Sequence, residues 1–101
     1  NLVENAGVVG AQLKRGIETL VAEHPRVLSN PRGRGLMCAV DLRDTPTRDA
    51  VADRCYETGM MILGCGRAGL RFRPPLDITA AEVDEGLGIL RGALHKVAGA
   101  V

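Results

Sequence analysis

The sequence predicts a single α+β domain over residues 1–101, in which helices pack on a small, mainly antiparallel sheet. Two observations predict it. Stretches with helical apolar spacing alternate with short apolar runs, in the order helix, strands, helix, strands, helix. The chain has 101 residues, 46% of them hydrophobic and 25% charged, which is typical of one small globular domain rather than a disordered segment.

The first helix is expected over residues 2–23, because apolar residues recur there every three or four positions. They are Leu2, Ala6, Val9, Leu13, Ile17 and Leu20. Pro25 ends the pattern. Gly7, Gly10 and Gly16 each weaken a helix by roughly 1 kcal/mol relative to Ala. They suggest close packing on a neighbouring element, and tolerance of glycine at a helix surface is the alternative.

The next part of the chain is expected to form a short strand at 26–29, a turn at 30–34 and a strand at 35–42. In the longer strand, Leu36, Cys38, Val40 and Leu42 share one face, and Met37, Ala39 and Asp41 share the other. The first face is apolar and the second only partly so. We therefore expect one face in the core and one partly covered.

A helix is expected over residues 47–58, starting at Thr45-Pro46 or at Thr47, with Val51 and Cys55 inward and Gly59 after its end. A strand at 60–63, a glycine-rich turn at 64–69 and a strand at 70–73 follow, and two prolines close the last strand.

The last helix has the clearest start signal, because Thr79-Ala80-Ala81-Glu82 is a capping box and Ile78 with Val83 forms a hydrophobic staple. Its inner stripe is Val83, Leu87, Leu90, Leu94 and Val97.

Composition argues against several classes of protein. A net charge of +1 and 2% aromatic residues disfavour binding to nucleic acid or to a membrane surface. No apolar run reaches the roughly 18 residues of a membrane span, and no signal peptide is visible. Cys38, Cys55 and Cys65 form no metal or disulfide pattern, so we expect buried, reduced thiols in a cytoplasmic protein. The helical pattern already runs at the first residues, as expected of a chain cut from a longer protein.

Two motifs could carry chemistry. Residues 64–69 match G-x-G-x-x-G, but no helix follows, so a hairpin turn is favoured over a dinucleotide site, and the Cys65 thiol within it is expected to be unreactive.

Arg71 and Arg73 share one face of their strand and could hold a carboxylate, since the planar guanidinium binds one bidentately. A solvated strand face, or an ion pair with Asp or Glu, is the alternative for the two arginines. His24 and His95 are expected to be separate residues at helix C-termini.

Three segments in order, 31–42 (PRGRGLMCAVDL), 47–59 (TRDAVADRCYETG) and 70–84 (LRFRPPLDITAAEVD), resemble the C-terminal segment of class-III aminotransferases. The resemblance covers almost the whole chain. The form Arg-Phe-Arg-Pro-Pro-Leu is most similar to the actinobacterial lysine 6-aminotransferase branch.

The resemblance implies a pyridoxal phosphate enzyme of fold-type I, with this chain forming most of its small domain. It implies that Arg71 binds the substrate carboxylate, with Arg73 in support, and that the lysine bonded to the cofactor lies in a large domain outside this chain. No catalytic, cofactor-binding or metal-binding residue is then expected here, since Lys14 and Lys96 match no family lysine motif. The chain alone would be inactive.

The implied reaction moves the ε-amino group of L-lysine to 2-oxoglutarate, giving 2-aminoadipate 6-semialdehyde and glutamate. The implied partners are amino-acid and 2-oxo-acid substrates, the rest of the aminotransferase chain and further copies in a homo-oligomer. A class-III enzyme of ornithine, acetylornithine or 4-aminobutyrate type remains an alternative. So do a non-catalytic α+β ligand-binding module and an inactive structural fragment.

Overall fold

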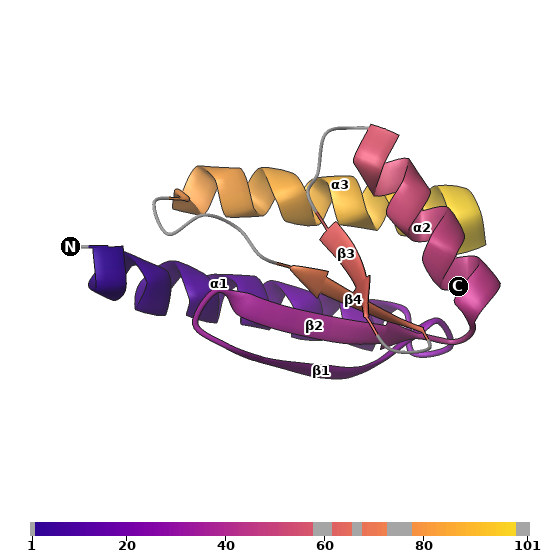
Figure 1. Cartoon of the computed structure of the whole chain (residues 1–101), viewed down its shortest axis with the longest axis horizontal. Helices are drawn as coiled ribbons and strands as arrows, with labels where there is room; N and C mark the ends of the chain where they lie inside the picture. Colours follow the sequence, from indigo (N-terminus) through magenta and orange to yellow (C-terminus); the bar gives the residue numbers. More distant parts are fainter. Residues whose placement is uncertain (1, 58–61, 66–67, 73–77, 99–101) are drawn as a thin grey trace.

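The computed structural model describes residues 2–57, 62–65, 68–72 and 78–98, which fold into helices on a four-stranded sheet (Figure 1). The elements are α1 (Leu2–Glu23), β1 (Leu28–Arg34), β2 (Met37–Leu42), α2 (Thr45–Glu57), β3 (Ile62–Cys65), β4 (Gly69–Phe72) and α3 (Ala80–Ala98). The strand order is β1-β2-β4-β3, and each neighbouring pair is antiparallel. The predicted α+β class is confirmed.

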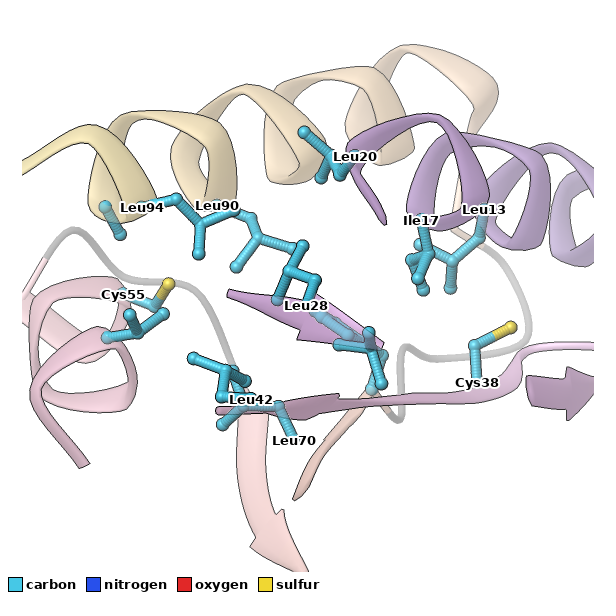
Figure 2. Packing of buried hydrophobic residues seen from close by; sticks show 14 of the residues in the cluster. Leu13, Ile17, Leu20, Leu28, Cys38, Leu42, Cys55, Leu70, Leu90 and Leu94 are labelled. Carbon is cyan, nitrogen blue, oxygen red and sulfur yellow. The ribbon is translucent and has the colours of Figure 1, made fainter. Parts of the chain in front are cut away.

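The core lies between the helices and one face of the sheet. Helix α1 packs on β1 and β2, α2 packs on β2, β3 and β4, and α3 packs on both other helices. Figure 2 shows side chains of all three helices meeting Leu28, Cys38, Leu42 and Leu70 of the strands. The predicted inward face of residues 36–42 is confirmed, since its four side chains are at most 6% exposed. Among the described residues, no helix is apolar enough over a sufficient length to cross a bilayer.

Helix α1 has the predicted bounds, and two of its three glycines lie where a neighbour comes close. A Cβ on Gly10 would lie 2.2 Å from the carbonyl of Gly35, in the turn that joins β1 to β2. A Cβ on Gly16 would lie 2.2 Å from the Leu87 side chain of α3. Gly7 has open space instead. Glycine at position 10 therefore allows the helix to cross directly over the hairpin turn.

The turn predicted at residues 30–34 is wrong, because these residues belong to β1. The chain reverses at Gly35 and Leu36 instead, with Gly35 at φ +52°. Asn30 has φ +53°, and the register with β2 shifts between Ser29 and Arg32. This is a β-bulge, which uses the same Asn-Pro-x-Gly residues that a turn would use.

Helix α2 begins at Thr45, two residues before the predicted start, and its cap is Asp44 rather than a threonine. The Thr47 N–H donates to Asp44 Oδ1 at 2.7 Å, and the Arg48 N–H donates to the Asp44 carbonyl at 3.1 Å. Hydrogen bonds from the Thr47 side chain and backbone hold the pKa of Asp44 below its ordinary value. Val51 and Cys55 face the core as predicted, and Gly59 lies outside the described residues.

The expected hairpin between the last two strands is confirmed, with shifted bounds. Strand β3 covers residues 62–65 rather than 60–63, so Gly64 and Cys65 lie in the strand and not in the turn. Strand β4 begins at Gly69, directly opposite Cys65. The glycine-rich run therefore joins two antiparallel strands and opens no helix, which rules out the dinucleotide interpretation.

The capping box of α3 is confirmed. The Glu82 N–H donates to Thr79 Oγ1 at 3.1 Å, and the Thr79 N–H donates back to Glu82 Oε1 at 3.0 Å. Along the predicted inner stripe, Val83, Leu90 and Leu94 are at most 3% exposed.

Candidate functional site

The candidate site lies on the sheet face that turns away from the helices, called the open face here. Its described side chains are Ser29, Arg32 and Arg34 of β1, Met37, Ala39 and Asp41 of β2, and Arg71 of β4. Residues next to them in the strands point into the core, so alternation places these side chains on the other face. Met37 is 57% exposed and Arg34 is also exposed, so this face is only partly covered, as predicted.

Arg71 occupies a central position in the sheet, because β4 pairs with β2 on one side and β3 on the other. Its partners in register are Ala39 and Leu63. The flanking Leu70 and Phe72 are at most 2% exposed in the core, so the strand holds the Arg71 backbone firmly. The Arg71 side chain itself is half-buried on the open face.

The Arg71 guanidinium has hydrogen-bonding capacity that the described residues do not use. Its Nε atom is buried and donates to no acceptor in that part of the chain. A buried donor without an acceptor costs roughly 1–3 kcal/mol, so an acceptor that binds there is favoured. Within the described ranges no carboxylate pairs with Arg71, and the ion-pair alternative raised by its sequence is not observed there.

Asp41 is the open-face carboxylate in the described residues, and it is already engaged. Arg32 Nη1 lies 3.1 Å from Asp41 Oδ1, and Asn30 Nδ2 donates to Asp41 Oδ2 at 3.1 Å. This cluster could not be predicted from the sequence, because it depends on the bulge in β1. Arg73, expected beside Arg71, lies outside the described residues, and its supporting role stays a prediction.

The described thiols are buried, as predicted. Cys38 is 1% exposed and Cys55 is 0% exposed. Burial raises the pKa of Cys55 to about 11, and burial also raises the pKa of Cys38, opposed in part by the charge of Lys14. Such thiols are protonated at neutral pH and are poor nucleophiles. Cys65 ends β3, and its side chain lies outside the described part.

His24 and His95 form a contact that sequence reasoning missed. Their ring centroids are 5.3 Å apart at an interplanar angle of 84°. Helices α1 and α3 run side by side in the same direction, since Asn5 bonds the carbonyl of Ile78 near their starts and Arg91 bonds Glu23 near their ends. Parallel packing brings both C-termini together, and a single sequence does not show how helices pair. Among the described residues no cluster of three or more His, Cys, Asp or Glu could hold a metal ion.

The two lysines lie away from the open face. Lys14 lies on α1 and Lys96 on α3, in the helical layer and not on the open face. Lys96 is exposed and Lys14 is half-buried. The described part of the open face thus has an arginine with an unused donor, Arg71, but no lysine beside it.

Comparisons with known proteins agree on one family. The model of the aminotransferase class-III family matches residues 1–94. The chain is 50% identical over 95 residues to an L-lysine-epsilon aminotransferase of Amycolatopsis lactamdurans, covering 93% of this chain and 21% of that protein. It is 47% identical over 93 residues to the protein of the same name in Streptomyces clavuligerus, covering 91% and 20%. Acetylornithine aminotransferases match at lower identity.

A solved structure has the same fold. Lysine aminotransferase from M. tuberculosis, in the internal aldimine form, superposes with a TM-score of 0.91 at 38% identity, covering 95% of this chain and 22% of that one. The chain spans about a fifth of the length of the relatives that it matches. Because the family model matches most of its length, this chain belongs to the class-III aminotransferases.

Proposed function

We propose that the chain is the C-terminal, small-domain segment of a longer transaminase, which moves the ε-amino group of L-lysine to 2-oxoglutarate. The products are 2-aminoadipate 6-semialdehyde and glutamate. Identities of 50% and 47% to proteins named L-lysine-epsilon aminotransferase, over more than nine tenths of the chain, favour this substrate. We further propose that the enzyme works in the cytoplasm, where buried thiols such as Cys38 stay reduced.

The observation that carries the proposal is the buried Nε of Arg71, which has no hydrogen-bond acceptor among the described residues. L-lysine, 2-oxoglutarate and both products all carry a carboxylate. The planar fork of arginine binds a carboxylate through two parallel, charge-assisted hydrogen bonds, which fix the orientation as well as the position of the substrate. Arg71 stands on a central strand, so its backbone cannot easily yield when the substrate binds. Arg73 would support it.

Class-III aminotransferases use pyridoxal phosphate, which acts as an electron sink when it is bound. We propose that the rest of the longer chain holds the cofactor, because Lys14 and Lys96 do not fit the task. The 101-residue chain should then show no transamination, and borohydride reduction with pyridoxal phosphate should label only generic surface lysine. Saturable labelling of Lys14 or Lys96 together with turnover would overturn the assignment.

Arg71→Ala in the full-length enzyme tests the site. Loss of one partner of a partly buried charge pair should weaken substrate binding by roughly 2–5 kcal/mol. The loss should be observed as a higher KM for both substrates, with the cofactor still bound. Arg71→Lys should recover part of this loss, because an ammonium group lacks the planar fork. The measurement is kcat/KM for each half-reaction. If Arg73→Ala proves more damaging than Arg71→Ala, the role belongs to Arg73.

The weaker matches to acetylornithine aminotransferases favour one other activity of the same family. Comparing kcat/KM for L-lysine, ornithine, acetylornithine and 4-aminobutyrate as amino donors separates these activities. A full-length protein that binds amino acids at Arg71 but converts none of them would instead be the non-catalytic ligand-binding module.

A further inference from the structure

The bulge in β1 directs a charged side chain toward the neighbourhood of Arg71. Ser29 pairs with Asp41, and Arg32 pairs with Ala39, so three steps along β1 match two along β2. Residues three apart in a regular strand point to opposite faces. The extra residue of the bulge keeps Ser29 and Arg32 on the same face, and Asn30 takes up the positive φ of +53° that this requires.

The side chains brought together in this way bind both oxygens of one carboxylate. Arg32 Nη1 lies 3.1 Å from Asp41 Oδ1, and Asn30 Nδ2 donates to Asp41 Oδ2 at 3.1 Å. Arg32 Nη1 also donates to the Asn30 carbonyl at 3.0 Å, which fixes the arginine against its own strand. We call Asn30, Arg32 and Asp41 the Asp41 cluster.

The Asp41 cluster lies next to Arg71. On β4, the partner of Asp41 is Gly69, and the partner of Ala39 is Arg71. Asp41 and Arg71 are therefore diagonal neighbours on the open face, a relation that spans roughly 7–8 Å and lies within reach of an arginine side chain. Gly69 places no side chain between them. Of the described carboxylates, Asp41 is the one in register to pair with Arg71, yet it pairs with β1 instead.

We propose that Arg32 is a positioning residue that holds the Asp41 carboxylate away from Arg71, so that the Arg71 guanidinium stays available for the carboxylate of the substrate. The proposal rests on the proposed function of Arg71. Without Arg32, Asp41 would compete with the substrate carboxylate for the same donors, and a competing internal carboxylate raises the KM of a ligand that binds through its own carboxylate without affecting the chemical step.

Arg32→Ala in the full-length enzyme should raise the KM for 2-oxoglutarate and L-lysine roughly three- to tenfold, as expected for a charge pair of intermediate exposure. The kcat should change by less than about twofold, since no transition-state contact is lost. Arg32→Lys should recover most of the effect by keeping the charge. Should Arg32→Ala not fold, Asn30→Gly removes the other donor while tolerating the positive φ, and it should raise KM by a smaller factor.

A double-mutant cycle separates this mechanism from a general loss of positive charge. A field effect alone would make Arg32→Ala and Asp41→Asn additive in their effects on log KM. We expect strong coupling instead. Asp41→Asn should lower KM far more in the Arg32→Ala background than on its own, and the KM of the double variant should be close to that of the parent enzyme.

Arg91→Ala is the matched control. Arg91 and Glu23 form an ion pair of 3.2 Å with side chains 47% and 46% exposed, close to the 3.1 Å, 42% and 35% of Arg32 and Asp41. It lies between the helices, so KM should not change. An additive cycle, or an unchanged KM in Arg32→Ala while Arg71→Ala raises it, would overturn this inference alone. An unchanged KM in Arg71→Ala would overturn the proposed function.

Discussion

Burial raises the pKa of the Cys55 thiol to about 11 from its ordinary value of 9.0, and this couples the stability of the domain to pH. The folded chain keeps the thiol proton at pH values where the unfolded chain has lost it. Stability from this group is therefore complete below about pH 9 and is lost as the pH rises from 9 towards 11. Near pH 10.5 the loss should be on the order of 1–2 kcal/mol.

The measurement is the unfolding free energy of the parent chain and of Cys55→Ala at pH 7 and at pH 10.5. The difference between the two chains cancels every other group that titrates, including Cys38, whose pKa is raised in the same direction. The destabilising effect of Cys55→Ala should be smaller at the higher pH. An equal effect at both values would contradict a buried, protonated thiol.

For single residues, the sequence can predict the direction of a side chain, but it cannot predict contacts with distant parts of the chain. Strand alternation placed Arg71 opposite Leu70 and Phe72, and the structure agrees. The sequence could not predict that Arg71 Nε lacks an acceptor in the described part of the chain, nor that His24 contacts His95. Both depend on how segments far apart in the sequence pack together.

Helix α1 crosses the β1–β2 turn at Gly10, whereas a Cβ added at Gly7 would meet open space. Gly10→Ala would force a methyl group to 2.2 Å from the Gly35 carbonyl, so helix and hairpin must move apart. We expect a loss of roughly 1–3 kcal/mol, the range for overpacking. Gly7→Ala should stabilise by up to about 1 kcal/mol through helix propensity. Thermal or urea unfolding of both variants measures these changes in stability. If both variants were destabilised, or both stabilised, the close approach of α1 to the turn at Gly10 would be contradicted.

The start of α3 rests on the reciprocal bonds between Thr79 and Glu82. Thr79→Ala removes the acceptor for the Glu82 N–H and should cost roughly 0.5–2 kcal/mol of unfolding free energy. Thr19→Ala is the control, because Thr19 is also exposed but lies inside α1 and bonds the Arg15 carbonyl. Alanine there should be neutral or slightly stabilising, since it is the better helix former. Similar losses of unfolding free energy in both variants would show that the Thr79 cap contributes no more than an exposed threonine inside a helix.

Helices and their caps were predictable from this sequence because their signals are local, whereas the bulge was not. The bounds of α1 and the Thr79 cap follow from spacing and residue type within one segment. Residues 30–34 carry turn chemistry, and only pairing with β2 decides that they continue a strand. The Asp41 cluster depends on the same bulge, so the part of the site around Arg32 could not be predicted from the sequence either.

For the molecule as a whole, the strand order leaves β1 and β3 at the two edges of the described sheet. Unpaired strand edges favour association, as do exposed apolar side chains. Val3 and Val8 on α1 are 79% and 71% exposed, and Met37 on the open face is 57% exposed. In the proposed full-length enzyme, the rest of the chain would cover part of this surface. The 101-residue chain by itself should therefore form dimers or larger species.

Sedimentation velocity over a range of concentrations measures this association, and the average sedimentation coefficient should rise with concentration. Val3→Lys with Val8→Lys should shift the chain towards monomer if the outer face of α1 is the contact, because two ammonium groups resist burial. Thr19→Lys with Ala22→Lys adds the same charge at exposed positions of α1 without removing a large apolar side chain. Association that survives both pairs would place the contact on the open face or at the strand edges. A monomer at every concentration would contradict the prediction.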